Sequence, residues 1–381
     1  MQADCESCEL LLRAVAQPPD AEQIQRAAVK VRDWDSVLRL AHEHRVSSML
    51  FSRLANMGPA VPLIVQNRLR AEYDSNMFHN LANAVELLAV LKLLEHEMIP
   101  AMPFKGVVLG ASIYHDPTTR PAGDLDLLIN YTHLKPAMAI LLERGYELKT
   151  LARADGTPFD PNYTYEYRLE RKTDGMILEL GWRLELAQPK FRRDLGLDWV
   201  WPSRRTTILA GAEVPDMSPE ITLLVLCLHG GKHAWSRLIW ICDVAQLLAS
   251  SPDLDWKEVI HEAKKSGLCR TLALGVLLAH QVAGATVPPA VLRRFEADTT
   301  ARNLAQHFQQ NLFAAPGITP MGRIPYTVQL LDFRDQVRWL LSFDFLRPNE
   351  RDRAALQLPK PLHALYYLIR PFRIFWDRSA R

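Results

Sequence analysis

The chain has 381 residues, of which 48% are hydrophobic and 23% are charged, and its formal net charge is +2. These values predict a soluble globular protein of more than one domain. They exclude a strongly basic protein that binds nucleic acid through its overall charge. No run of about 18 uninterrupted apolar residues predicts a transmembrane helix, and the acidic N-terminus does not resemble a signal peptide. The five cysteines are scattered, so we expect free thiols and a cytoplasmic location.

Residues 1–95 are predicted to form an N-terminal helical region. Apolar residues recur there at spacings of three and four, which is the periodicity of amphipathic helices. The clearest runs are residues 10–15, 34–41, 63–69 and 81–94. No residue in this region points to chemistry beyond packing, and we expect the helices to cover a central domain.

Residues 96–204 are predicted to form that central domain, which belongs to the α+β class. In chain order we expect a strand at 98–104, a helix at 107–114, a strand at 124–129 and a helix at 132–144. Thr132 is the expected N-cap of the last helix, and Gly145 is its expected C-terminal stop.

A β-hairpin completes the central domain. Side chains alternate between apolar and polar from Tyr163 to Glu170, which is the period of a half-buried strand. Asp174-Gly175 is a typical hairpin turn, and residues 176–184 supply the partner strand. The domain is therefore expected to contain a largely antiparallel sheet.

Residues 205–381 are predicted to form a C-terminal helical region. A shallow connector at 205–217 precedes the first helix, which the pair Gly230-Gly231 is expected to interrupt. The segment 362–376 is aromatic and basic. A packing helix is favoured there over contact with a membrane surface, since a proline interrupts the segment.

The sequence Asp124-Leu125-Asp126 places two acids in an otherwise apolar strand. Residues two apart in a strand point to the same face, so the two carboxylates are expected to lie side by side. Like charges this close are unfavourable unless a cation lies between them, which favours a divalent metal site. The alternative is a solvated strand end, where aspartate is common.

Glu179 is a third candidate because it is a lone acid between Ile177 and Gly181. If its strand lies beside the strand with the two aspartates, three carboxylates converge. Such a set suits two divalent cations that also bind substrate phosphates. The alternative is an ion pair across the hairpin with Arg168 or Arg183.

Together these patterns resemble the nucleotidyltransferase fold of the DNA polymerase β superfamily. More narrowly, two segments are similar to an uncharacterised bacterial nucleotidyltransferase family, namely FKGVVLGASIYHDPTTRPAGDLDLLI and LCLHGGKHAWSRLIWICDVAQLL. In that family a Lys-Gly dipeptide leads to an Arg-Pro-x-x-Asp-x-Asp core. With the ILELGW strand between the two segments, the resemblance spans roughly residues 98–250.

The resemblance implies a polymerase β-like core with a mixed, largely antiparallel sheet, flanked by helical regions. It implies metal-dependent transfer of a nucleoside monophosphate from an NTP to an acceptor hydroxyl, with release of pyrophosphate. Asp124, Asp126 and Glu179 would be catalytic and would bind two Mg²⁺ ions, with Glu179 also a candidate base. A small-molecule, sugar or protein acceptor is expected, because the near-neutral charge disfavours nucleic acid.

This sequence departs from the superfamily pattern in two places. Lys105-Gly106 stands where most active members have Gly-Ser, and the strand at Glu179-Leu180-Gly181-Trp182 lacks the usual histidine. Gly106 still allows backbone N–H groups to approach a phosphate, and Lys105 would supply positive charge. The departures motivate an alternative, a catalytically weak or inactive nucleotide- or partner-binding module. A growth-arresting toxin of the superfamily would differ only in its acceptor.

The segment His229-Gly230-Gly231-Lys232-His233 is a second source of nucleotide contacts. The glycines are expected to permit a bend that brings Lys232 and His233 toward the nucleotide. A metal site at His229 and His233 is disfavoured because the glycines weaken the helix and no glutamate follows the first histidine.

Two arginines have alternative roles. Arg120 is predicted to bind nucleotide phosphate, since a guanidinium contacts phosphate through two donors, or to pair with Asp116 or Asp124. Arg237 is predicted to bind phosphate or to pair with Asp243.

Overall fold

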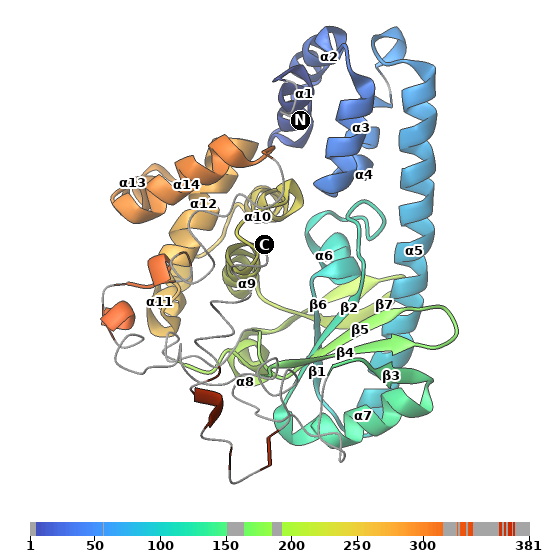
Figure 1. Ribbon diagram of the computed structural model, residues 1–381, viewed down its shortest axis with the longest axis vertical. Coiled ribbons are helices and arrows are strands. Elements are labelled where there is room, and N and C mark those ends of the chain that lie inside the picture. The colour runs from blue at the N-terminus through green and yellow to red at the C-terminus, as the bar shows by residue number, and fades with distance from the viewer. Residues whose placement is uncertain are drawn as a thin grey trace.

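The computed structural model describes residues 5–55, 57–150, 164–184, 193–314, 326, 328–332 and 334–337, together with positions 358, 359, 362, 365–367 and 369. Most of segment 362–376 lies outside the described residues, as does Tyr163. In the described part of the chain, helices lie on both sides of a five-stranded sheet (Figure 1), which confirms the predicted α+β class. No disulfide joins the five cysteines, all of which are described.

The N-terminal part of the described chain is helical. It contains α1 (Cys5–Val15), α2 (Ala21–Lys30), α3 (Trp34–Glu43), α4 (Ser47–Leu54) and α5 (Leu63–His96). The carboxylates of Asp20 and Asp33 accept hydrogen bonds from the first backbone N–H groups of α2 and α3, which fixes where these helices begin. In Figure 1, α5 extends from the N-terminal helices to the sheet.

By length and composition, α5 is the one helix in the described ranges that would be able to cross a membrane. Core helices of soluble proteins pass the same test, and 39% of the apolar window of α5 is buried inside the protein. Its Glu86 is buried and is bonded to Arg144 and Arg171 on neighbouring elements. These contacts make α5 a packed helix of the fold.

The central sheet contains β1 (Ala101–Phe104), β2 (Leu125–Ile129), β3 (Tyr146–Leu148), β4 (Glu166–Arg171) and β5 (Ile177–Gly181). The strand order is β1-β2-β5-β4-β3, and β2 and β5 are parallel whereas the other neighbours are antiparallel. Helix α6 (Gly106–Ile113) connects β1 to β2, and α7 (Leu134–Glu143) connects β2 to β3. The sheet is therefore mixed and largely antiparallel, as predicted.

The start of α7 differs from the prediction. The helix begins at Leu134, after a 3₁₀ turn at Tyr131–His133. Asn130 caps this turn, because its Oδ1 accepts a hydrogen bond from the Thr132 N–H at 3.1 Å. The N-cap position of α7 itself is His133, so Thr132 is not the cap. Asparagine readily forms such turns with the backbone two residues ahead. Gly145 follows the helix with φ +89°, which agrees with its predicted role as a stop.

The side chains of β2 separate two apolar clusters. Leu125, Leu127 and Ile129 belong to the cluster that includes residues of α5 and α7. Leu128 belongs to a second cluster, built mainly from the N- and C-terminal helices. Asp126 shares the face of Leu128, because side chains two apart in a strand point the same way. The acidic face of the sheet is therefore turned toward the C-terminal helices.

The predicted connector at 205–217 is wrong. This segment forms a hairpin of β6 (Arg205–Leu209) and β7 (Ala212–Asp216), whose strands pack against α6 and β1. Ala210 and Gly211 form the turn, and both have positive φ, +48° and +84°. Alanine seldom adopts positive φ, so the dipeptide gives little sequence signal for a hairpin.

After the short α8 (Leu197–Val200) and this hairpin, the described chain is again helical. The helices are α9 (Pro219–Lys232), α10 (Leu238–Ser250), α11 (Trp256–Ser266), α12 (Cys269–Ala283), α13 (Pro289–Glu296) and α14 (Thr299–Asn311). Their apolar side chains share one buried cluster with residues of α1 to α4. The division of the chain into residues 1–95, 96–204 and 205–381 stays a prediction.

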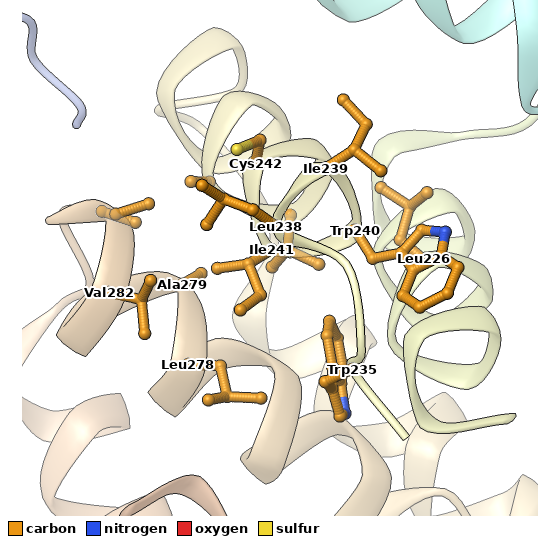
Figure 2. Packing of buried hydrophobic residues seen from close by; sticks show 14 of the residues in the cluster. Leu226, Trp235, Leu238, Ile239, Trp240, Ile241, Cys242, Leu278, Ala279 and Val282 are labelled. Carbon is orange, nitrogen blue, oxygen red and sulfur yellow. The ribbon is translucent and has the colours of Figure 1, made fainter. Parts of the chain in front are cut away.

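The pair Gly230-Gly231 does not interrupt α9, which continues to Lys232. A Cβ on Gly230 would lie 2.4 Å from the ring of Trp235, so this glycine makes room for the indole. Trp235 is 1% exposed and belongs to the buried cluster drawn in Figure 2. The predicted bend is therefore wrong, because Gly230 serves the packing of a large side chain next to the helix.

Candidate active site

The three predicted catalytic acids lie at one end of the β2–β5 strand pair. Asp126 and Glu179 are direct neighbours in the parallel register, and Asp124 lies two residues before Asp126. On the adjacent β4, Arg168 is aligned with Glu179 and Glu166 is aligned with the nearby Gly181. The sheet therefore turns four carboxylates toward the C-terminal helices.

Helix α5 positions the loop that leads into β2. The Asn80 amide nitrogen donates to the carbonyl oxygens of Pro117 and Arg120, at 2.7 and 2.8 Å. The Asn80 Oδ1 accepts from the Ala122 N–H at 3.1 Å, and Asn83 donates to the Ala122 carbonyl at 3.1 Å. Because these polar groups are buried, each bond lost would leave an unsatisfied donor or acceptor. The two asparagines thereby fix the chain immediately before Asp124.

Lys105 has a strained backbone and a buried charge. Its φ is +57° and its ψ is −149°, a region that is nearly exclusive to glycine. The Lys105 Nζ donates to the Asp126 Oδ1 at 2.8 Å, and the two side chains are 16% and 5% exposed. Burial by itself would lower the pKa of Lys105, but the Asp126 carboxylate raises it above its usual value. Gly106 follows with φ +43° and begins α6.

Burial and repulsion by neighbouring carboxylates raise the pKa values of Asp124 and Glu179. Burial, followed by the charge of Asp126, raises the pKa of Asp124. Burial, followed by the charges of Asp126, Glu166 and Asp124, raises the pKa of Glu179 to about 7. A cation between these groups would relieve the repulsion.

The structure provides little compensation for the charge of Glu179. The Arg168 guanidinium lies 3.8 Å from Glu179, and half of the arginine side chain is exposed. Such a pair contributes little. Arg183, the alternative partner predicted for Glu179, pairs instead with Asp194 at 2.8 Å. Among the described residues, no three His, Cys, Asp or Glu side chains are arranged as a ready-made metal site.

Arg120 makes a different ion pair from those predicted. Its Nε and Nη2 donate to the two carboxylate oxygens of Asp243 at 2.8 and 2.9 Å, and both residues are buried. The Tyr114 hydroxyl donates to the same carboxylate at 2.9 Å. The predicted pairing of Arg120 with Asp116 or Asp124 is therefore wrong.

The predicted pairing of Arg237 with Asp243 is also wrong, because Asp243 is bonded to Arg120. The Arg237 guanidinium instead lies over the ring of Trp240, 5.6 Å from its centroid.

The end of α9 faces the acids from the other side. The Lys232 Nζ lies 3.7 Å from the Glu166 Oε1 and 4.7 Å from the ring centroid of Tyr165. The His233 ring stacks on Trp240 with 4.9 Å between centroids, and His229 packs edge-on against His233. Burial lowers the pKa of His229 well below its usual value, so this ring is neutral. Lys232 and His233 stand at the C-terminal end of α9, and all three side chains line the same cavity as the acids.

One open cavity of about 420 Å³ connects the acids with the helices. It is lined by the eight residues predicted to be catalytic or nucleotide-binding, which are Lys105, Gly106, Arg120, Asp124, Asp126, Glu179, Lys232 and His233. Arg237, for which phosphate binding was one of two predicted roles, also lines it. Among the further lining residues, Glu166 and Arg45 carry charges that sequence reasoning did not assign to the site. Glu166 was correctly placed on the polar face of its strand, but a strand pattern does not show what covers that face. Arg45 lies just after α3, and no pattern in the neighbouring sequence indicates that it belongs to a binding site.

Residues 30–284 of the chain match an uncharacterised nucleotidyltransferase family. The chain belongs to this family. The predicted family membership is thereby confirmed, and no curated protein matches the chain significantly. The matched range includes the N- and C-terminal helical segments that line the cavity. The family region therefore extends beyond the sheet.

Two solved structures resemble parts of this nucleotidyltransferase-family protein. One is the antibiotic-resistance factor ANT(2'')-Ia, with 14% identity and a TM-score of 0.32 over 48% of this chain and 88% of that one. The other is an antigenic nucleotidyltransferase-like protein from Paracoccidioides brasiliensis, with 16% identity and a TM-score of 0.33 over 55% and 94%. Neither similarity is strong enough to indicate a substrate.

Proposed function

We propose that this protein transfers a nucleoside monophosphate from an NTP to an acceptor hydroxyl in a magnesium-dependent reaction that releases pyrophosphate. The observation that carries the proposal is the parallel register that pairs Asp126 with Glu179, with Asp124 two residues before Asp126 at the same cavity. Family membership supports the general reaction class. The proposed acceptor is a small molecule, a sugar or a protein.

The chemistry of these side chains fits magnesium. Mg²⁺ takes oxygen ligands and is usually held by one or two carboxylates together with substrate phosphates. Asp124 and Asp126 would be those carboxylates, with Glu179 completing the site for a second ion. Because Lys105 is bonded to Asp126, we expect tight metal binding only when the nucleotide is present. When bound, the ions would supply charge that stabilises the phosphates and the leaving group.

The side chains of the protein have distinct roles in the proposed reaction. Glu179, the candidate base, accepts the proton of the acceptor hydroxyl. The acceptor oxygen forms a bond to the α-phosphorus, the bond from that phosphorus to the bridging oxygen breaks, and pyrophosphate leaves. Gly106 lets the backbone approach the phosphates, while Lys105, Lys232 and His233 donate hydrogen bonds to them. Arg120 is already bonded to Asp243 and would contribute mainly its charge.

A transfer assay with radiolabelled NTPs tests the proposal. Each of the four NTPs is incubated with the protein, Mg²⁺ and a cell extract, and label on an acceptor is measured. Asp124→Asn and Asp126→Asn are expected to lower transfer by about a hundredfold or more, because each removes charge stabilisation needed in the transition state. Chelation of Mg²⁺ is expected to have the same effect.

Asp35→Asn is the matched control, since the Asp35 side chain is 86% exposed. Wild-type protein that neither binds NTP with Mg²⁺ nor transfers label contradicts the proposal, as do aspartate variants that retain full activity.

A nucleotide-binding module with little catalysis is the second candidate. The contact of Lys105 with Asp126 favours it, since the ammonium occupies a carboxylate oxygen that a metal would need. This candidate predicts NTP binding without transfer of label to any acceptor.

A further inference from the structure

Two arginines at the cavity have no role in the function proposed above. Arg45 lies between α3 and α4, with φ +57°, and Arg237 immediately precedes α10. They are far apart in the sequence, yet both line the cavity that holds the catalytic acids.

His44 brings the two arginines together. The His44 Nδ1 accepts a hydrogen bond from the Leu238 N–H at 3.1 Å, and the His44 carbonyl accepts one from the Ile239 N–H at 3.3 Å. His44 thereby caps the start of α10 from the N-terminal helices. Because Arg45 follows His44 and Arg237 precedes Leu238, the cap sets both arginines at the edge of the cavity.

The two positive charges are not matched by acids. Within the described ranges, no carboxylate lies within 4.0 Å of either guanidinium. Burial, followed by the charge of Arg237, lowers the pKa of Arg45, and Asp124 is the carboxylate that opposes this effect. The neighbouring Arg120 is neutralised by Asp243. Like charges gathered at a cavity without partners are unfavourable, and a bound anion would relieve them.

The positive charges around the cavity differ between its two ends. Arg45 and Arg237 lie at the end near Asp124. Lys232 lies beside Glu166, whose charge acts on Glu179 at the other end. An extended anion bound at the aspartates would therefore meet unpaired guanidinium groups at the end with Arg45 and Arg237. At the other end the Lys232 ammonium is already paired with Glu166.

We infer that Arg45 and Arg237 bind the β- and γ-phosphates of the nucleotide, which leave together as pyrophosphate. The inference rests on the proposed function and adds the direction of the bound nucleotide. Guanidinium groups contact phosphate oxygens through two parallel N–H donors, and such charged hydrogen bonds are stronger than neutral ones. With the phosphate tail directed to the arginines, the acceptor enters at the end with Glu179 and Glu166, where Lys232 contacts the α-phosphate that is transferred.

The test compares three ligands by isothermal titration calorimetry in the presence of Mg²⁺: pyrophosphate, an NTP and the matching nucleoside monophosphate. Arg45→Gln and Arg237→Gln are each expected to weaken pyrophosphate and NTP binding by roughly tenfold to a hundredfold, the effect of one charged hydrogen-bonding group. Binding of the monophosphate is expected to stay unchanged, because it lacks both phosphates. Arg32→Gln, whose side chain is 90% exposed, is the control.

The outcomes separate this inference from the proposed function. Arginine variants that bind pyrophosphate and NTP like the wild type overturn the inference and leave the proposed reaction intact. Arginine-dependent pyrophosphate binding without any transfer of label supports the inference and contradicts the reaction. If Arg45→Gln fails to fold by circular dichroism, Arg45→Lys retains the charge without the paired donors. It is expected to bind pyrophosphate more weakly than the wild type, and unchanged binding overturns the inference.

Discussion

Lys105 combines two unfavourable features that the surrounding structure compensates. A residue with a side chain in its backbone conformation costs about 1–3 kcal/mol, and the position corresponds to the glycine of the Gly-Ser pattern that this sequence lacks. Its ammonium forms a buried ion pair with Asp126. Lys105 therefore adopts a backbone conformation typical of glycine and adds a positive charge beside the predicted catalytic acids.

Removing this ammonium is expected to be costly. Lys105→Met would leave the Asp126 carboxylate buried beside other acids, and loss of one partner of a buried pair lowers the free energy of unfolding by about 3–5 kcal/mol. Urea unfolding without divalent cations measures the change. The double variant Lys105→Met/Asp126→Asn removes both charges and is expected to recover most of the loss. A single variant as stable as the wild type would contradict the proposed compensation.

Helix α9 shows how an element can contain two adjacent glycines for different reasons. Gly230 lies against the ring of Trp235, whereas a Cβ on Gly231 would make ordinary contacts at 3.5 Å. Helix propensity alone predicts the same effect of alanine at both positions. Packing distinguishes the two positions.

Gly230→Ala is expected to lower the free energy of unfolding by about 1–3 kcal/mol, because the new methyl group would displace a buried indole. Gly231→Ala, the matched control, is expected to be neutral or stabilising by up to about 1 kcal/mol, since alanine favours the helix. Thermal unfolding followed by circular dichroism compares the two variants. Equal effects at both positions would show that the contact with Trp235 is unimportant.

At the scale of the whole molecule, His44 joins the N-terminal helices to α10 and must be neutral to do so. Its Nδ1 accepts a hydrogen bond, and burial lowers its pKa from 6.5 to about 4. In the unfolded chain the imidazole takes up a proton below about pH 6.5. Between pH 6.5 and 4 the unfolded state therefore binds more protons than the folded state, so stability falls as the pH falls.

The contribution of His44 is expected to be complete above pH 6.5 and to diminish by roughly 2–3 kcal/mol as the pH approaches 4. Urea unfolding across this range measures the slope. His44→Gln retains a hydrogen-bond acceptor but does not titrate, so its stability is expected to depend less on pH. Parallel slopes for the two proteins would exclude His44 as the cause.

Interactions between residues close in the sequence were predictable, whereas those between residues far apart in the sequence were not. Asp124, Asp126 and Glu179 stand out locally, as acids in apolar strands, and the strand pattern also predicts the sheet that aligns them. The Arg120–Asp243 pair joins residues 123 positions apart, and no local pattern identifies such a partner. The contact between His44 and Leu238 spans 194 positions, so the placement of Arg45 was not predictable.

The length and continuity of α5 have a mechanical consequence. The helix contacts α3 and α4, which flank Arg45, and also α6, α7 and β1, which lie near the predicted catalytic acids. Its 34 residues include no proline and no glycine, the usual sites of helix kinks. The N-terminal helices and the sheet are therefore connected by a stiff rod rather than a hinge. A nucleotide would therefore meet a preformed spacing between Arg45 and Asp124, because the elements that carry them contact the same rigid helix.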